Sequence, residues 1–207
     1  YVSRALQEAG ASWFGVSNLD EAMQIRNAGI VEPILILAYT PPEEAARLAR
    51  RWGADEGLAR RAGILHDCTK YLDMEEQLQL CAKYGIVLDE LEQTAVKLLH
   101  AKTGACVARD VYGVSDDIYD AIFWHTTAKA DMTTLEKILY VADYMEPNRD
   151  FEGVEELRRL AYEDLDRALL LGVETTIQEM RDRRLPIHTN TLRARDWLRE
   201  HGTKTEE

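Results

Sequence analysis

Five side chains of the types that bind divalent metals recur in order along the chain. His66 and Asp67 are adjacent, and His100, His125 and Asp143 follow at wide spacing. Imidazole and carboxylate ligands together favour borderline ions such as iron, manganese or zinc, and a shared carboxylate can hold two ions about 3.5–4 Å apart. Neighbours on a helix differ in direction by about 100°, so the imidazole of the doublet could bind one ion while its carboxylate bridges both. The residue types predict a metal centre.

Such a centre is suited to phosphate hydrolysis. A metal pair lowers the pKa of a bound water and neutralises charge on a phosphate oxygen. Lys70 follows Asp67 by three residues, where its ammonium could face an anion held by the metals. The pattern therefore points to a metal-dependent phosphohydrolase, with Asp67 and Lys70 as the candidate catalytic residues.

Each of these residues also has a simpler interpretation. A lone histidine on an apolar helix face is more often a hydrogen-bonded core residue than a ligand, and Lys70 could be a surface lysine. The context favours the metal, because Asp143 directly follows the apolar run 138–142 and His66 follows 62–65. Burying a polar group at the end of an apolar run costs free energy unless the group has a hydrogen-bond, ionic or metal partner.

Composition excludes several classes of function. The 207 residues carry a net charge of -12, which argues against a sequence-independent nucleic-acid binder, since such proteins display basic faces. The three cysteines form no CxxC pair and no even-numbered framework, which favours a reduced, cytoplasmic compartment. No apolar run of about 18 residues and no signal-like start is visible, so no membrane partner is expected.

The elements that must position the ligands change in character near residue 40. Before it, residues 12–16 and 34–37 read as strands and 18–28 as a helix capped by Asn18 or Asp20. After it only helical patterns occur, over 43–53, 55–66, 74–84, 88–112, 115–126, 133–146, 153–182 with a break near Gly172, and 190–200. We expect a mainly α protein, with a βαβ-like α/β appendage over 1–40 and a helical domain over 41–207.

Four segments carry a family resemblance. They are Ala62-Gly63-Ile64-Leu65-His66-Asp67-Cys68-Thr69-Lys70, Leu98-Leu99-His100-Ala101, Ala121-Ile122-Phe123-Trp124-His125-Thr126-Thr127 and Val141-Ala142-Asp143-Tyr144-Met145-Glu146-Pro147-Asn148-Arg149. From about residue 46 to 197 the chain resembles the bacterial HD-domain symmetrical bis(5′-nucleosyl)-tetraphosphatases. The resemblance implies a helical HD bundle, a dinuclear centre of iron (or manganese), and hydrolysis of diadenosine tetraphosphate to two ADP.

The resemblance also implies roles for single residues. Asp67 would bridge the metals, His66 and Asp143 would bind one ion, and His100 and His125 the other. Three further side chains could contact substrate phosphates: Lys70, Thr126 and Arg149. The alternatives are that Thr126 merely ends a helix and that Arg149 pairs with Glu146.

One expected ligand is missing. A member of this family should carry another histidine on its first helix, and the corresponding position here is close to Leu37, whereas residues 1–65 contain no histidine. Glu43 or Glu44 could take the place of this histidine as a ligand, but both lie more than one helical turn nearer the end of the helix. Losing one of the expected ligands would weaken metal binding, so hydrolytic activity could be low or lost.

The leading residues carry a second resemblance. Residues 1–49, with Leu19-Asp20-Glu21-Ala22 and Pro33-Ile34-Leu35-Ile36-Leu37, are similar to the early βα units of the alanine racemase barrel. No lysine precedes Lys70, so the Schiff-base residue of a pyridoxal phosphate enzyme is absent here and we expect no such cofactor. The chain reads as a chimera, and a two-strand unit is marginal by itself.

The leading hypothesis is a metal-dependent phosphoanhydride hydrolase acting on dinucleoside polyphosphates. Alternatives are a broader nucleotide phosphohydrolase and a non-catalytic HD domain that binds nucleotide and metal, which the histidine gap favours. An alanine racemase role ranks last. The apolar and aromatic content is compatible with a homodimer.

Overall fold

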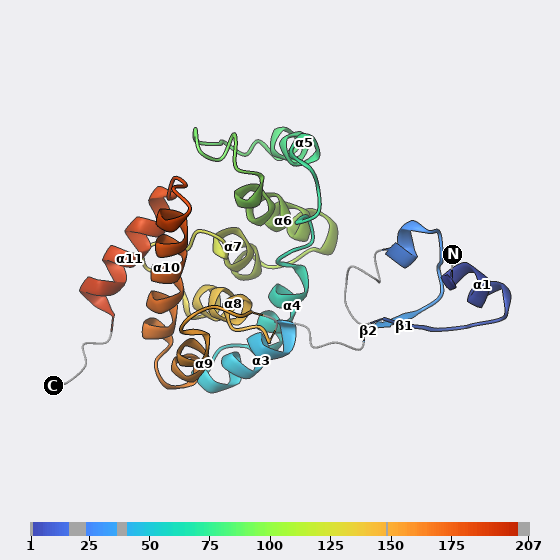
Figure 1. Ribbon diagram of the computed structural model, residues 1–207, viewed down its shortest axis with the longest axis horizontal. Coiled ribbons are helices and arrows are strands. Elements are labelled where there is room, and N and C mark those ends of the chain that lie inside the picture. Colours follow the sequence, from blue (N-terminus) through green and yellow to red (C-terminus); the bar gives the residue numbers. More distant parts are fainter. Residues whose placement is uncertain (1, 17–23, 37–40, 148, 203–207) are drawn as a thin grey trace. The chain divides into compact units, whose positions relative to one another are not determined.

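A computed structural model describes residues 2–16, 24–36, 41–147 and 149–202 (Figure 1). The chain divides into two compact units, Tyr1–Thr40 and Pro41–Glu207. Each unit has its own hydrophobic core. Among the described helices, none combines the length and the apolar character that crossing a membrane requires.

The first unit is a small α/β fragment. Strands β1 (Phe14–Val16) and β2 (Ile34–Ile36) pair in parallel, with Phe14 opposite Ile34, as expected for the predicted βαβ-like unit. Residues 24–27 are helical, whereas the predicted start of that helix and its cap at Asn18 or Asp20 lie outside the described residues. The helix α1 (Val2–Glu8) was not predicted, although Arg, Ala, Leu, Gln and Glu are all good helix formers.

The second unit is a helical bundle, which confirms the predicted mainly α fold. Its helices are α3 (Pro41–Trp52), α4 (Glu56–Leu65), α5 (Met74–Tyr84), α6 (Val96–Tyr112), α7 (Asp116–Trp124), α8 (Thr134–Tyr144), α9 (Val154–Glu163), α10 (Leu165–Asp182) and α11 (Thr189–His201).

Helix α8 lies at the centre of this bundle. It packs against α3, α4, α7 and α10, and Figure 1 shows it between them. Its residues 138–142 are fully or almost fully buried, which is the arrangement expected for a helix that is apolar all round. Because the apolar run ends at Asp143, this carboxylate is delivered to the interior.

Two predicted boundaries were wrong. The helix predicted over 88–112 begins only at Val96. Before it, the Asp89 carboxylate accepts a hydrogen bond from the Glu92 backbone N–H and the Glu92 carboxylate accepts one from that of Asp89. Such local side-chain bonds offer the backbone an alternative to the helix.

The break in the long helical segment falls at Asp164 and not near Gly172. Asp164 has an extended backbone and caps α10 through the Arg167 N–H. Gly172 lies inside α10, where an added Cβ would meet Tyr140 Cε1 at 3.2 Å. This glycine therefore permits close packing of α10 on α8 and does not interrupt the helix.

Candidate metal centre

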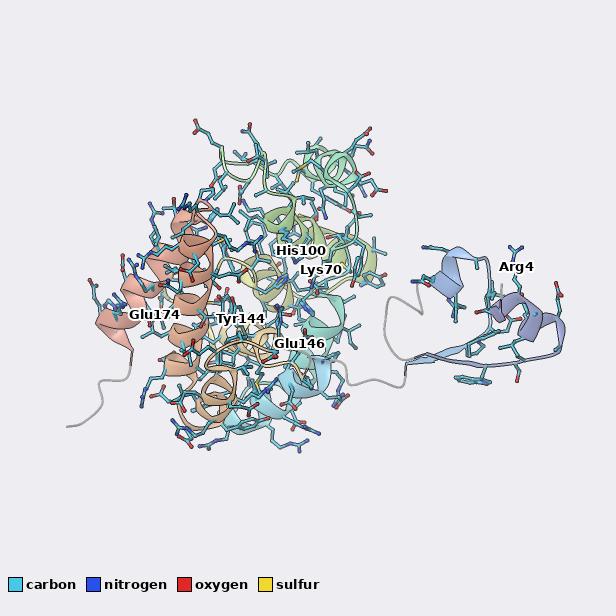
Figure 2. The ribbon with its side chains drawn as sticks, viewed as in Figure 1. Arg4, Lys70, His100, Tyr144, Glu146 and Glu174 are labelled. Carbon is cyan, nitrogen blue, oxygen red and sulfur yellow. The ribbon has the colours of Figure 1, made fainter. Side chains whose placement is uncertain are left out.

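The ends of helices deliver most of the candidate ligands. His66 and His125 are the residues that end α4 and α7, Asp67 follows His66, and Asp143 is the penultimate residue of α8. His100 lies in the second turn of α6. Figure 2 shows His100 and Lys70 near one another, in line with their shared contact to Asp67. The structure brings the side chains of all five predicted ligand residues together in one cluster, which we call the metal pocket.

Asp67 lies at the centre of this pocket. Its Oδ1 is 3.2 Å from His100 Nε2 and 3.6 Å from His125 Nε2. Its Oδ2 is 3.3 Å from His66 Nε2, which is itself 3.6 Å from Asp143 Oδ1. Ligand atoms that share one ion at about 2.0–2.2 Å lie roughly 3 Å apart, so each oxygen of Asp67 faces a separate group of donors at suitable spacing.

The backbone fixes the orientation of two imidazoles. His66 Nδ1 is 2.8 Å from the Gly63 carbonyl and His125 Nδ1 is 2.7 Å from the Ile122 carbonyl. A carbonyl can only accept, so each Nδ1 carries a proton, and in the neutral imidazole the Nε2 lone pair is the one that a metal would bind. Histidines that bind metals are commonly held in this way.

Neighbouring charges keep the carboxylates of Asp67 and Asp143 ionised although both groups are largely buried. Burial alone would raise the pKa of Asp67, but the three neighbouring imidazoles hold that pKa well below its usual range. Burial also opposes ionisation of Asp143, whose pKa is nevertheless lowered, chiefly by His66. Burial lowers the pKa of His66, and the two carboxylates more than offset this and raise that pKa to about 10.

The pocket has polar atoms that need a cation or proton. His66 Nε2 and Asp67 Oδ1 are buried and make no hydrogen bond. His100 Nε2 and His125 Nε2 are 3.2 Å apart, and two lone pairs at this distance repel unless a proton or cation lies between them. Three residues, His66, Asp67 and His125, each offer one ligand atom, and these three atoms lie within 4.8 Å of one another. These residues fit a divalent metal.

Two cations border the pocket at the positions that the sequence singled out. Lys70 Nζ is 2.6 Å from Asp67 Oδ2, and the Lys70 side chain is 41% exposed. Arg149 Nη2 is 3.3 Å from Asp143 Oδ2, while Arg149 Nε is 3.4 Å from Glu146 Oε1. Both cations therefore contact ligand carboxylates and remain accessible to an anion.

The two threonines after His125 differ. Thr127 Oγ1 donates to the Ala128 carbonyl, and its own carbonyl accepts from Thr191. Thr126 Oγ1 is buried and makes no hydrogen bond, so its hydroxyl is the one that could serve a ligand.

Helix α3 does not replace the missing histidine. Glu43 is paired with Arg60, and Glu44 accepts hydrogen bonds from Arg47 and from Tyr162, each at 2.7 Å. Pro42 packs against Gly63, where an added Cβ would be 2.8 Å from Pro42 Cα. Leu37, the position nearest the expected ligand, lies outside the described residues.

Sequence reasoning missed Arg158 of α9. Its guanidinium donates to the carbonyls of Met145, Glu146 and Arg149 at 2.8–3.2 Å. These hydrogen bonds hold the backbone of the segment between Asp143 and Arg149 in place. No sequence signal marks this role, because Arg158 lies in a charged amphipathic helix and resembles any solvated arginine.

A second group of possible ligands lines a surface hollow. His188 Nε2 is 3.2 Å from Asp89 Oδ2 and 3.4 Å from Glu92 Oε1. His188 Nδ1, however, accepts the Asn190 N–H as the N-cap of α11. A neutral His188 must then carry its proton on Nε2, and Lys102 Nζ is 2.5 Å from Glu92 Oε1. The group is an internal ion-paired link between the 86–95 segment and α11.

Two family models match this chain. The HD domain family model matches residues 43–148, and that of the alanine racemase N-terminal domain matches residues 1–59. The two matches overlap over residues 43–59. An alanine racemase of Carboxydothermus hydrogenoformans is 53% identical over 47 residues, which is 23% of this chain and 13% of that protein.

The larger unit has relatives over most of its length. The Bacillus subtilis protein named "Bis(5'-nucleosyl)-tetraphosphatase, symmetrical" is 37% identical over 182 residues, covering 87% of this chain and 97% of the relative. A crystal structure from Clostridium acetobutylicum, titled a predicted HD superfamily hydrolase involved in NAD metabolism, is 40% identical with a TM-score of 0.75. That match covers 77% of this chain and 85% of the other.

Proposed function

The chain belongs to the HD-domain family of symmetrical bis(5′-nucleosyl)-tetraphosphatases, and we propose that it hydrolyses diadenosine tetraphosphate and related dinucleoside polyphosphates to two nucleoside diphosphates. It is a hydrolase of this family, and its site has the donor set that a divalent metal requires. The observation that carries the proposal is the convergence of three imidazole Nε2 atoms on the two oxygens of Asp67.

Asp67 would bridge two ions in this site. His66 and Asp143 face its Oδ2 side, whereas His100 and His125 face Oδ1. When bound, the metals neutralise charge on the phosphoryl oxygen and lower the pKa of a water nucleophile. We propose iron or manganese, because mixed imidazole and carboxylate ligands favour such ions.

The cations beside the pocket would hold the polyphosphate. Lys70 and Arg149 each contact a ligand carboxylate and also reach solvent, so a phosphate could take over part of these contacts. A guanidinium can bind two phosphate oxygens at once. The unpartnered hydroxyl of Thr126 would donate to a further oxygen. These groups offset the negative charge that develops during the attack.

The first experiment is product analysis with diadenosine tetraphosphate. Protein loaded with Mn²⁺ or Fe²⁺ should release ADP only, and chelation should abolish the reaction. Release of ATP and AMP would refute symmetrical cleavage, and an intact substrate would refute the hydrolase function. A panel including deoxynucleotides would separate this activity from that of a broader nucleotide phosphohydrolase.

Lys70→Met tests the phosphate contact. We expect kcat/KM to fall at least about tenfold, the equivalent of one charge-assisted hydrogen bond. Lys83→Met is the matched control, because Lys83 is an exposed lysine whose described polar partners are Asp110 and Tyr84, and neither of these is a candidate site residue. Equal activities of the two variants would exclude Lys70 from substrate binding.

A binding function without turnover is the second candidate. It is favoured by the commitment of Glu43 and Glu44 to other partners, which leaves the first-helix ligand unreplaced among the described residues. Metal analysis discriminates between the candidates: a binding-only domain should retain one ion per chain, whereas the hydrolase should hold two.

The remaining predictions concern the surroundings of the protein. We propose a cytoplasmic protein that binds neither nucleic acid nor pyridoxal phosphate and that could form a homodimer. We also propose that residues 1–40 and 41–207 are separate domains of different origin.

A further inference from the structure

A buried polar cluster lies beside the metal pocket and takes no direct part in it. Gln77 of α5 and Thr103 of α6 are fully buried, and Thr69, two residues after Asp67, is 4% exposed. Buried glutamine is rare and requires hydrogen-bond partners. Here all its partners belong to the segments that carry Asp67 and His100.

The amide of Gln77 can adopt only one orientation. One end is 2.6 Å from the Thr69 carbonyl, which can only accept, so Nε2 must donate there. The other end is therefore Oε1, and it accepts from Thr103 Oγ1 at 2.6 Å. A methionine or leucine of similar size could supply neither bond.

The cluster joins the Asp67 turn to α6. Thr69 Oγ1 donates to the His100 carbonyl at 3.0 Å and is 2.9 Å from Thr103 Oγ1. Gly104 permits the close approach, because an added Cβ would be 3.4 Å from the His66 carbonyl oxygen and 3.3 Å from Thr69 Oγ1. Gln77 is therefore linked directly to the backbone of the turn that carries Asp67. Through Thr103 and Thr69 it is also linked to the backbone carbonyl of His100.

We propose that Gln77 is a positioning residue that fixes the separation of Asp67 and His100, and hence the affinity of the pocket for divalent metal. This inference rests on the proposed metal centre. Without Gln77, the Thr69 carbonyl and the Thr103 hydroxyl each lose a partner, and the turn can move relative to α6. Residues that hold metal ligands in place commonly change metal affinity by about 10–100-fold when replaced.

The test compares Gln77→Met with Gln79→Met in the full chain. Gln79 lies on the same helix but is exposed, and its side-chain amide donates to the Glu75 carboxylate at 3.4 Å. Titration of the metal-free proteins with Mn²⁺ alone should show at least tenfold weaker binding for Gln77→Met and unchanged binding for Gln79→Met. Amide exchange of the metal-free protein should accelerate over residues 66–72 only in Gln77→Met.

A double variant separates positioning from simple stabilisation. In Gln77→Met the Thr103 hydroxyl loses its 2.6 Å acceptor and keeps only longer contacts, such as that with the Leu99 carbonyl at 3.1 Å. Adding Thr103→Val removes this hydroxyl, so thermal stability should recover in part while Mn²⁺ affinity stays low. Recovery of both would overturn the inference, as would wild-type affinity in Gln77→Met. Wild-type protein that binds no Mn²⁺ would overturn the proposed metal centre itself, and this inference with it.

Discussion

The two units of this chain differ in how much apolar surface their own elements can bury. In the first, the core among the described residues consists of Phe14, Ile25 and Ile30 with Ala11 beside them. In the second, one continuous core runs from α3 to α11 around the buried helix α8. Hydrophobic stabilisation scales with the apolar area removed from water, so the second unit should account for most of the folding free energy.

The same difference in buried surface bears on which unit can support a chemical site. In the first unit Trp13 and Val31 are 64% and 82% exposed, and two parallel strands are normally covered on both faces. In the second unit the packed helices carry five polar side chains to one point at the cost of burying them. A precise site requires this rigid support, and among the described residues it is found in the second unit.

The largest expected effect comes from Asp67→Ala. Metal affinity and hydrolysis should both fall by more than about 100-fold, because removing a direct ligand exceeds the effect of removing its supporting residues. The counterpart in the first unit is Glu32→Ala, which removes a partly buried carboxylate that accepts hydrogen bonds from Gln7 and should leave hydrolysis unchanged. Metal titration and steady-state kinetics check both.

Core truncation should reveal unequal contributions to stability. Ile138→Ala in α8 should lower the free energy of unfolding by about 2–5 kcal/mol, the usual range for emptying a packed site. Ile30→Ala, also at a fully buried position, should leave the main unfolding transition unchanged. Urea unfolding followed by circular dichroism measures this, and equal shifts would contradict two separate cores.

Amide exchange should distinguish the units without any mutation. Helices α8 and α10 should be protected to the level of global unfolding, whereas the backbone of β1 and β2 should exchange by local opening. Uniform protection over both units would show that the first is stabilised as strongly as the second.

The smallest effect is expected at Arg158. Arg158→Gln removes charged donors from three carbonyls of the segment between Asp143 and Arg149, and kcat/KM should fall about tenfold. Glu155→Gln is the control, because it removes only the exposed ion pair of Arg158 and such pairs contribute little. An equal loss in both variants would exclude the backbone contacts as the cause.

Helical positions could be predicted where periodicity and stop signals agree. The strand pair, the bundle and the apolar run of α8 all follow from local pattern. The start of α6 and the break at Asp164 could not, since both depend on particular side-chain bonds to the backbone. Gly172 shows the limit most clearly, because it reads as a break and in fact serves the packing of α10 on Tyr140.

The amino-acid sequence by itself determined the ligand types, their order and the helices that carry them, because these depend on residue identity and short-range pattern. Only the tertiary structure decided that Asp67 lies between the three imidazoles, that their Nε2 atoms face its carboxylate, and that Gln77 and Arg158 support the site. These features depend on which helix packs on which, and contacts between residues far apart in the sequence leave no local periodicity to read.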